Sequence, residues 1–223
     1  MADKTSKFLL SDADALRRIK FTQFRSQVPS LVILAIAIVL PNIIRGTFVY
    51  TVALLVAVLA IAWYLFIGLS HRFKQRIPLP PDGSVVSPLQ GKIKFVRKND
   101  NVTLINIRKI VLDSVEIRSP HSECVLEDGQ LWLDTVKGRI SFRLNVKNVQ
   151  WFNSPDFTTG NIIGIAQGSG GCTISIPWVQ ELHVYEGDAV DCGDVMIDHL
   201  VTLQPQNSGE AEIQAEQEIP TEQ

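Results

Sequence analysis

Three side chains in the middle of the chain could bind a phosphate group: Lys92, Arg118 and His121. Lys92 lies in the run VVSPLQGKI, and Arg118 lies in the run DSVEIRSP, with His121 directly after it. In a domain held against a bilayer, such cations would meet a phospholipid phosphate with charge-assisted hydrogen bonds. Arg118 could instead pair with Asp113 or Glu116 in a structural contact, and the sequence leaves both alternatives open.

The two runs that carry these residues, at 85–93 and 113–120, resemble motifs of the phosphatidylserine decarboxylases. In the short, membrane-anchored form of that family, a Pro-rich exit from the membrane leads into S-P-A-D-G-K-V and then D-V-H-V-N-R-A-P. Here the exit is HRFKQRIPLPPDG, residues 71–83, so the order and the spacing both match. The resemblance covers about residues 48–200. It implies a β-rich sandwich domain and a role connected with phospholipid metabolism.

The chemistry of that family depends on an Asp, a His and a Ser. The Asp orients the His, the His activates the Ser, and the Ser attacks the preceding peptide bond and becomes a pyruvoyl group, the electron sink for decarboxylation. In this chain the Asp position is Gln90 and the His position is Val115, which cannot carry a proton. The late Gly-Ser, expected after GDVMI at 193–197, is absent. The resemblance therefore implies a scaffold without catalytic residues or cofactor, with a lipid-related binding or regulatory role.

Two other hypotheses stay open. An active pyruvoyl-dependent decarboxylase with a relocated apparatus would process itself at Ser169, in the run AQGSGGC, although this run is more simply a flexible turn between strands. Its nearest imidazole would be His121, but an offset of six residues from Val115 moves a side chain by about 20 Å along a strand. His121 is otherwise a polar loop residue. The remaining hypothesis is an accessory subunit of a membrane complex, with a protein partner.

The cysteines and the other histidines predict neither a metal site nor a disulfide. Cys124, Cys172 and Cys192 are odd in number and show no zinc or redox spacing, so we expect small buried residues in a reducing compartment. His183 and His199 have no Cys or acidic neighbour at ligand spacing.

Two apolar runs precede this domain and must position it. Between residues 31 and 69 the only charged residue is Arg45. The second arm, 48–69, has about the 20 apolar residues that span a bilayer, whereas the first arm is shorter and contains Pro41. The sequence predicts a transmembrane helical hairpin over 29–70.

Charge predicts the orientation of this hairpin. Basic residues flank it on both outer sides, namely Arg17, Arg18, Lys20 and Arg25 before it and Arg72, Lys74 and Arg76 after it. By the positive-inside rule, both ends lie in the cytoplasm, so we expect a multi-pass inner-membrane protein whose soluble domain faces the cytoplasm. A net charge of −2 argues against a nucleic-acid surface.

The segment before the hairpin, 1–28, contains helical periodicity. Ser11, with Asp14 three residues later, is typical of a helix start, and apolar residues then recur at helical spacing over 11–28. This predicts an amphipathic helix that lies at the membrane surface or runs into the first span; an ordinary solvated helix cap is the alternative.

After a Pro-rich linker at 71–83, the pattern changes to short β segments over 84–203. We expect an all-β, barrel-sandwich-like domain with Asp113 in a turn and Gly187 and Asp188 in another. The last part, 204–223, carries five Glu and no Lys or Arg and predicts a disordered acidic tail. Strands are predicted at 84–87, 92–97, 102–107, 110–112, 115–117, 131–136, 140–146, 162–166, 172–177 and 183–185.

Overall fold

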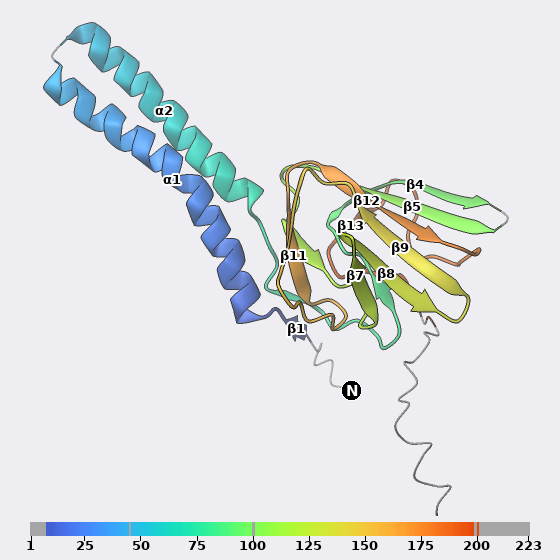
Figure 1. Cartoon of the computed structure of the whole chain (residues 1–223). Helices are drawn as coiled ribbons and strands as arrows, with labels where there is room; N and C mark the ends of the chain where they lie inside the picture. Colours follow the sequence, from blue (N-terminus) through green and yellow to red (C-terminus); the bar gives the residue numbers. More distant parts are fainter. Residues whose placement is uncertain (1–7, 45, 100, 199, 201–223) are drawn as a thin grey trace, which may run out of the picture.

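A computed structural model describes residues 8–44, 46–99, 101–198 and 200. Two long helices come first, and a strand-rich domain follows them (Figure 1). The predicted order of a helical hairpin and a β domain is therefore confirmed. The sheets of the described part do not close into a barrel. The predicted acidic tail at 204–223 lies outside the described residues.

The hairpin consists of α1 (Ala13–Ile43) and α2 (Thr47–Ser70), which pack along each other. Both helices are long and apolar enough to cross a membrane, and only 17% of the most apolar window of each is buried. Core helices of soluble proteins are mostly buried, so this pair has the surface of a membrane-associated hairpin. The predicted amphipathic helix and the first apolar arm form one continuous helix, α1, and its cap is Asp12, whose carboxylate accepts a hydrogen bond from the Asp14 N–H.

All strand pairs in the described part are antiparallel, and most belong to one seven-stranded sheet. Its order is β13 (Ala189–Val190), β4 (Gly91–Asn99), β5 (Val102–Lys109), β12 (Gly170–Ile176), β9 (Gly138–Leu144), β8 (Gln130–Thr135) and β7 (Cys124–Glu127). A second sheet has the order β10 (Asn148–Trp151), β11 (Ile162–Gln167) and β6 (Glu116–Arg118). Two short pairs join β14 (Val195–Ile197) to β3 (Val85–Val86) and β1 (Phe8–Leu10) to β2 (Arg76–Pro78).

The domain has two apolar clusters. The larger one lies between the sheets and includes Ile105, Phe142 and Ile174, whose strands alternate between buried and more exposed positions. Strand β11 is different, because its first five residues are all buried. One of its faces covers the main core, and the other packs against α1, where Ile165 meets Ile19. The first helix is therefore attached to the β domain by apolar contact (Figure 1).

The strand predictions were partly right. The segments at 110–112 and 183–185 are not strands, because hydrogen bonds of nearby aspartates hold them in turns. At the second of these, Asp188 accepts the Tyr185 N–H at 2.8 Å and Gly187 has φ 94°, as the predicted turn requires. Six strands were missed, namely β1, β2, β7, β10, β13 and β14, and β2 lies within the segment predicted as a linker. All six have two to four residues, too few for a clear periodic pattern.

Candidate functional site

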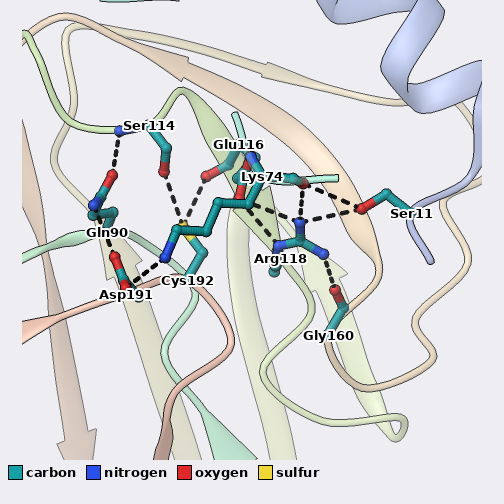
Figure 2. Close-up of polar contacts among 9 residues, drawn as sticks. All are labelled: Ser11, Lys74, Gln90, Ser114, Glu116, Arg118, Gly160, Asp191 and Cys192. Carbon is teal, nitrogen blue, oxygen red and sulfur yellow. Dashed lines mark hydrogen bonds and ion pairs between the residues drawn. The ribbon is translucent and has the colours of Figure 1, made fainter. Parts of the chain in front are cut away.

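Gln90, which the sequence resemblance aligns with the Asp of the decarboxylases, joins three segments of the chain. Its amide Nε2 donates to Asp191 Oδ1 at 2.8 Å, and its Oε1 accepts the Ser114 N–H at 2.7 Å (Figure 2). The other carboxylate oxygen of Asp191 pairs with the ammonium of Lys74, four residues beyond the end of α2. The geometry gives Gln90 a connecting role, and no imidazole is among its hydrogen-bond partners.

Val115, which the sequence resemblance aligns with the His of the decarboxylases, belongs to the contact between α1 and the β domain. It is buried in the smaller apolar cluster, with Ala15 and Ile19 of α1 and Ile165 of β11. Its backbone N–H donates to the carbonyl of Arg72 at 2.9 Å. An ionisable side chain here would lie among apolar groups, at a position that packs the helix against the sheet.

Glu116 and Arg118 form an ion pair (Figure 2), and neither side chain is exposed. The guanidinium reaches Glu116 Oε1 from both Nε and Nη2 at 3.2 Å. Its other bonds go to the Gly160 carbonyl at 2.7 Å, the Lys74 carbonyl at 2.7 Å and Ser11 Oγ at 3.1 Å. Arg118 is therefore not available to a lipid phosphate in this structure. Of the two alternatives drawn from the sequence, the structural pair with Glu116 is the one that forms.

Burial controls the protonation of this network. The pKa of Glu116 is raised by burial, and the Arg118 charge and the Lys74 N–H, which donates to Glu116 Oε2 at 2.7 Å, oppose that shift. Cys192 lies 3.3 Å from Ser114 Oγ, and burial raises the pKa of its thiol to about 12. A thiol with such a pKa is not a nucleophile at neutral pH.

The expectation of small buried cysteines is confirmed, since Cys124, Cys172 and Cys192 are all free and buried. Burial raises the pKa of each thiol to about 12. Lys109 is also buried, and this lowers its pKa, while its ammonium donates to the carbonyls of Ile110 and Asp113. The predicted turn role of Asp113 is confirmed, because its carboxylate accepts the Ile110 N–H at 2.6 Å.

His121 lies apart from Lys92 and Arg118. It is buried, its Nδ1 accepts the Glu123 N–H at 3.2 Å, and burial lowers the pKa of its imidazole. It borders a different cleft from Lys92, and Arg118 borders neither cleft. The three residues predicted to bind a headgroup are therefore not brought together.

The structure also places two further residues considered from the sequence, Ser169 and His183. Ser169 is in the two-residue turn between β11 and β12, as the simpler reading of that run predicted. His183 has no acidic neighbour at ligand spacing in the sequence, but the fold brings Asp198 to it, with 2.7 Å between His183 Nε2 and Asp198 Oδ2. Among the described residues, no group of three His, Cys, Asp or Glu side chains is arranged to hold a metal ion.

Lys92 does border a cleft, and its neighbour there is Arg108. The two are direct partners on the antiparallel strands β4 and β5, an arrangement in which like charges repel each other. They line a cleft of about 490 Å³ together with Gln90, Ile110, Asp113 and Asp191. Neither cation lies within 4.0 Å of a carboxylate in the part of the chain that the structure describes. Two cations without an ion-pair partner can attract an anion, and the carboxylates of Asp113 and Asp191 on the same lining oppose that attraction; we call this cleft the Lys92–Arg108 cleft.

No protein-family model, no curated protein and no solved structure matches this chain. The relationship to the phosphatidylserine decarboxylases therefore stays a prediction from the two motifs. What the geometry offers is a buried polar network that connects segments and, beside it, an open cleft with two exposed cations. The first can stabilise the fold, and the second can bind a phosphate.

The sequence analysis missed Arg108. The pattern of β4 and β5 around the turn at 99–102 indicated a hairpin, and a hairpin places residues near position 108 opposite Lys92. The register needed to choose among them depends on an irregularity between Ile93 and Phe95. That irregularity has no signal in the residue types.

Proposed function

We propose that this chain is a membrane-anchored, phosphatidylserine decarboxylase-like protein that binds anionic phospholipid at the cytoplasmic surface of the membrane and does not decarboxylate it. The observation that carries the proposal is the pair of cations, Lys92 and Arg108, side by side at one cleft without acidic partners. A lipid phosphate would accept charge-assisted hydrogen bonds from both.

The cleft lies close to the end of α2, where the chain leaves the hairpin and enters the β domain. Asp191, on its wall, pairs with Lys74, and α2 ends at Ser70. The loop that follows Arg108 carries Ile110 and Leu112, which are 50% and 46% exposed. Exposed aliphatic side chains beside cations are suited to the boundary between headgroups and acyl chains. With both helices across the bilayer, this rim of the domain would face the lipid headgroups.

The orientation follows from charge. The basic residues before α1 enters its apolar stretch and after α2 ends favour the cytoplasmic side for both ends and for the β domain. The inner leaflet carries anionic lipid, and each cation near its surface contributes about 1 kcal/mol to binding. Lys92 and Arg108 would therefore contribute about 2 kcal/mol toward an anionic membrane, and the carboxylates of Asp113 and Asp191 in the same cleft would reduce this gain.

Two substituted positions, Gln90 and Val115, support a protein that does not turn over its lipid. Decarboxylation by this family's scheme needs an imidazole and a self-processed Ser. Val115 is packed against α1, and Gln90 uses both ends of its amide in holding Ser114 and Asp191. Both side chains have structural partners of their own, which supports a retained scaffold rather than a relocated active site.

The test uses the full chain reconstituted in lipid nanodiscs. Intact-mass measurement is expected to give one uncleaved species, and phosphatidylserine supplied in the disc is expected to remain unchanged. Two fragments, one starting with a blocked residue at Ser169, together with new phosphatidylethanolamine, would favour the active-enzyme alternative. A stoichiometric protein that co-purifies and replaces lipid at the cleft would favour the accessory subunit.

Lipid binding is tested with matched variants. Native mass spectrometry of K92Q/R108Q is expected to show binding of anionic phospholipid weakened by about 30-fold, the equivalent of about 2 kcal/mol. The control K98Q/K137Q removes the same charge from exposed positions outside the cleft and is expected to bind like the unmodified chain. Equal weakening in both variants would contradict a site at the cleft.

A further inference from the structure

We infer that a second cleft, between α1 and the strand β10, holds one anionic phospholipid with its phosphate at Arg17 and Arg18. The inference rests on the proposed function in one respect, since it requires the hairpin in a bilayer with the β domain at the surface. The cleft has a volume of about 560 Å³. Its principal lining residues are Arg17, Arg18, Phe21, Trp151, Phe152 and Ile165, and we call it the helix–sheet cleft.

The charge of this cleft favours an anion. Its lining contains two guanidinium groups, the amides of Gln150 and Asn153, and no carboxylate. Within the described ranges, neither Arg17 nor Arg18 has a carboxylate within 4.0 Å. A separate cleft on the other side of Arg18 carries Asp residues, and they do not reach the guanidinium. Planar guanidinium groups bind phosphate oxygens in pairs, so a phosphate fits this wall.

The apolar part of the lining favours an amphiphile over a free phosphate ion. Phe21, Trp151 and Phe152 border the cleft, and the Arg18 guanidinium lies 5.2 Å from the centroid of the Phe152 ring. Phe21 is 67% exposed. The exposed ring of Phe21 is unfavourable in water and the two arginines attract an anion, so together they suit a lipid that has an anionic head and an apolar body.

The level of the cleft along the hairpin matches the headgroup layer. Gln27 of α1 lies beside Tyr64 of α2, since its Nε2 is 3.5 Å from the Tyr64 carbonyl. Counting outward from this pair in the antiparallel hairpin brings Phe21 level with Ser70, where α2 ends. Arg17 lies four residues farther, about 6 Å along the axis at 1.5 Å per residue. The headgroup region of one leaflet is about 5 to 8 Å thick. Measured from the end of α2, the guanidiniums therefore lie about one headgroup layer beyond the span, and Phe21 lies level with the last residue of α2.

The helix–sheet cleft and the Lys92–Arg108 cleft have no lining residue in common. The first is built where α1 packs on the small sheet, the second on the edge of the large sheet. Variants at one site thus leave the other intact, which allows the two proposals to fail separately.

The experiment places the full chain, with Trp63→Phe, in nanodiscs that contain brominated anionic phospholipid. Trp63 lies within α2, and its removal leaves the fluorescence to the β domain, where Trp151 borders the cleft. Quenching is expected with the brominated anionic lipid and at least fivefold less with brominated phosphatidylcholine. Adding R17Q/R18Q is expected to reduce the quenching by the anionic lipid at least fivefold. The matched control K20Q/R25Q changes two exposed cations of the same helix outside the cleft and is expected to keep it.

Several results would overturn the inference. Equal loss of quenching in R17Q/R18Q and K20Q/R25Q would mean general surface charge, and loss of quenching on adding inorganic phosphate would mean a free-phosphate site. If R17Q/R18Q quenches like the parent while K92Q/R108Q still binds less lipid, the inference fails and the proposed function stands. If K92Q/R108Q binds lipid normally while R17Q/R18Q loses quenching, the site at the Lys92–Arg108 cleft fails and the helix–sheet cleft stands. Thermal unfolding of each variant, matched to the parent, confirms that the fold is intact.

Discussion

Arg118 and Glu116, two residues apart on β6, form an ion pair from which water is excluded, since the side chains of both are 0% exposed. Through Arg118 this pair also holds Ser11, from before the first helix, and Lys74, from after the second (Figure 2). Both ends of the hairpin are therefore tied to one strand of the β domain. Arg118, which was predicted to bind a lipid headgroup, instead connects the β domain to the helical hairpin.

The ion pair predicts a large difference between single and double replacements. Arg118→Met leaves a buried carboxylate without its partner and is expected to lower the free energy of unfolding by about 3 to 5 kcal/mol. Adding Glu116→Gln to that variant is expected to restore part of the loss, because the buried charge is gone. Urea unfolding of the full chain in detergent, followed by tryptophan fluorescence, measures both. A double variant as unstable as the sum of the two single variants would contradict this account.

Gly91, between Gln90 and Lys92, is predicted to tolerate no side chain. A Cβ there would lie 2.4 Å from the Arg108 carbonyl oxygen, so β4 and β5 would have to separate. Gly91→Ala is expected to cost about 1 to 3 kcal/mol of unfolding free energy and to weaken lipid binding at the Lys92–Arg108 cleft. Gly46→Ala is the control, because its Cβ would meet only Val49 Cγ2, at 3.8 Å. Equal stability of the two variants in thermal unfolding would argue against this packing.

The buried cysteines predict a loss of stability at alkaline pH. Burial raises the pKa of Cys172 to about 12, whereas an exposed thiol titrates at about 8.5. Between these values the folded state keeps a proton that the unfolded state has lost. The contribution of the thiol to the free energy of unfolding is therefore fully present below about pH 8.5 and is lost as the pH rises. The slope is about 1.4 kcal/mol per pH unit for each thiol.

Cys172→Ala isolates this effect. Between about pH 9 and 12, the free energy of unfolding of the variant is expected to fall less steeply than that of the parent. The difference between the two slopes is the contribution of one thiol. Lys109 acts in the opposite direction, because its lowered pKa makes the unfolded state the better proton acceptor, and it is unchanged in both proteins. Unfolding curves collected across this pH range give the two slopes. Identical slopes would mean that the Cys172 thiol titrates normally in the folded protein.

Restoring the family's residues is predicted to harm the fold without producing activity. Val115→His places an imidazole in the cluster that joins α1 to β11, at a cost of about 1 to 3 kcal/mol for a buried polar group without a partner. Gln90→Asp in the same chain removes an amide that Asp191 accepts from and places two carboxylates close together. Mass spectrometry is expected to find the double variant uncleaved. Chain scission with turnover of phosphatidylserine would show that only these two residues separate this scaffold from an enzyme.

Local sequence patterns predicted most of the large elements. The apolar runs indicated the two helices, and segments rich in Val, Ile, Thr and aromatic residues, separated by Gly, Asn and Asp, indicated β4, β5, β8, β9, β11 and β12. Each of these depends on residues near one another in the chain, where periodicity reports directly on structure. The short strands β1 and β2 could not be found this way, because Leu9 pairs with Ile77 across the whole hairpin. Their pairing depends on α1 and α2 returning the chain to its starting point.

For the candidate sites, the residue types alone show which charges exist and that Gln90 and Val115 lack the groups that the decarboxylase chemistry needs. Which of these charges are free depends on contacts between segments that lie far apart in the chain. Arg118 is paired with Glu116 and donates to groups more than 40 residues away, such as Gly160 and Ser11.

The partner of Lys92 depends on one irregularity in β4. The regular register of Asn99 with Val102 would continue to place Lys92 opposite Lys109, and the shift between Ile93 and Phe95 brings Arg108 there instead. Because neighbouring residues on a strand point to opposite faces, this single step turns Lys92 to the exposed face beside Arg108, while Lys109 is buried on the other face of β5.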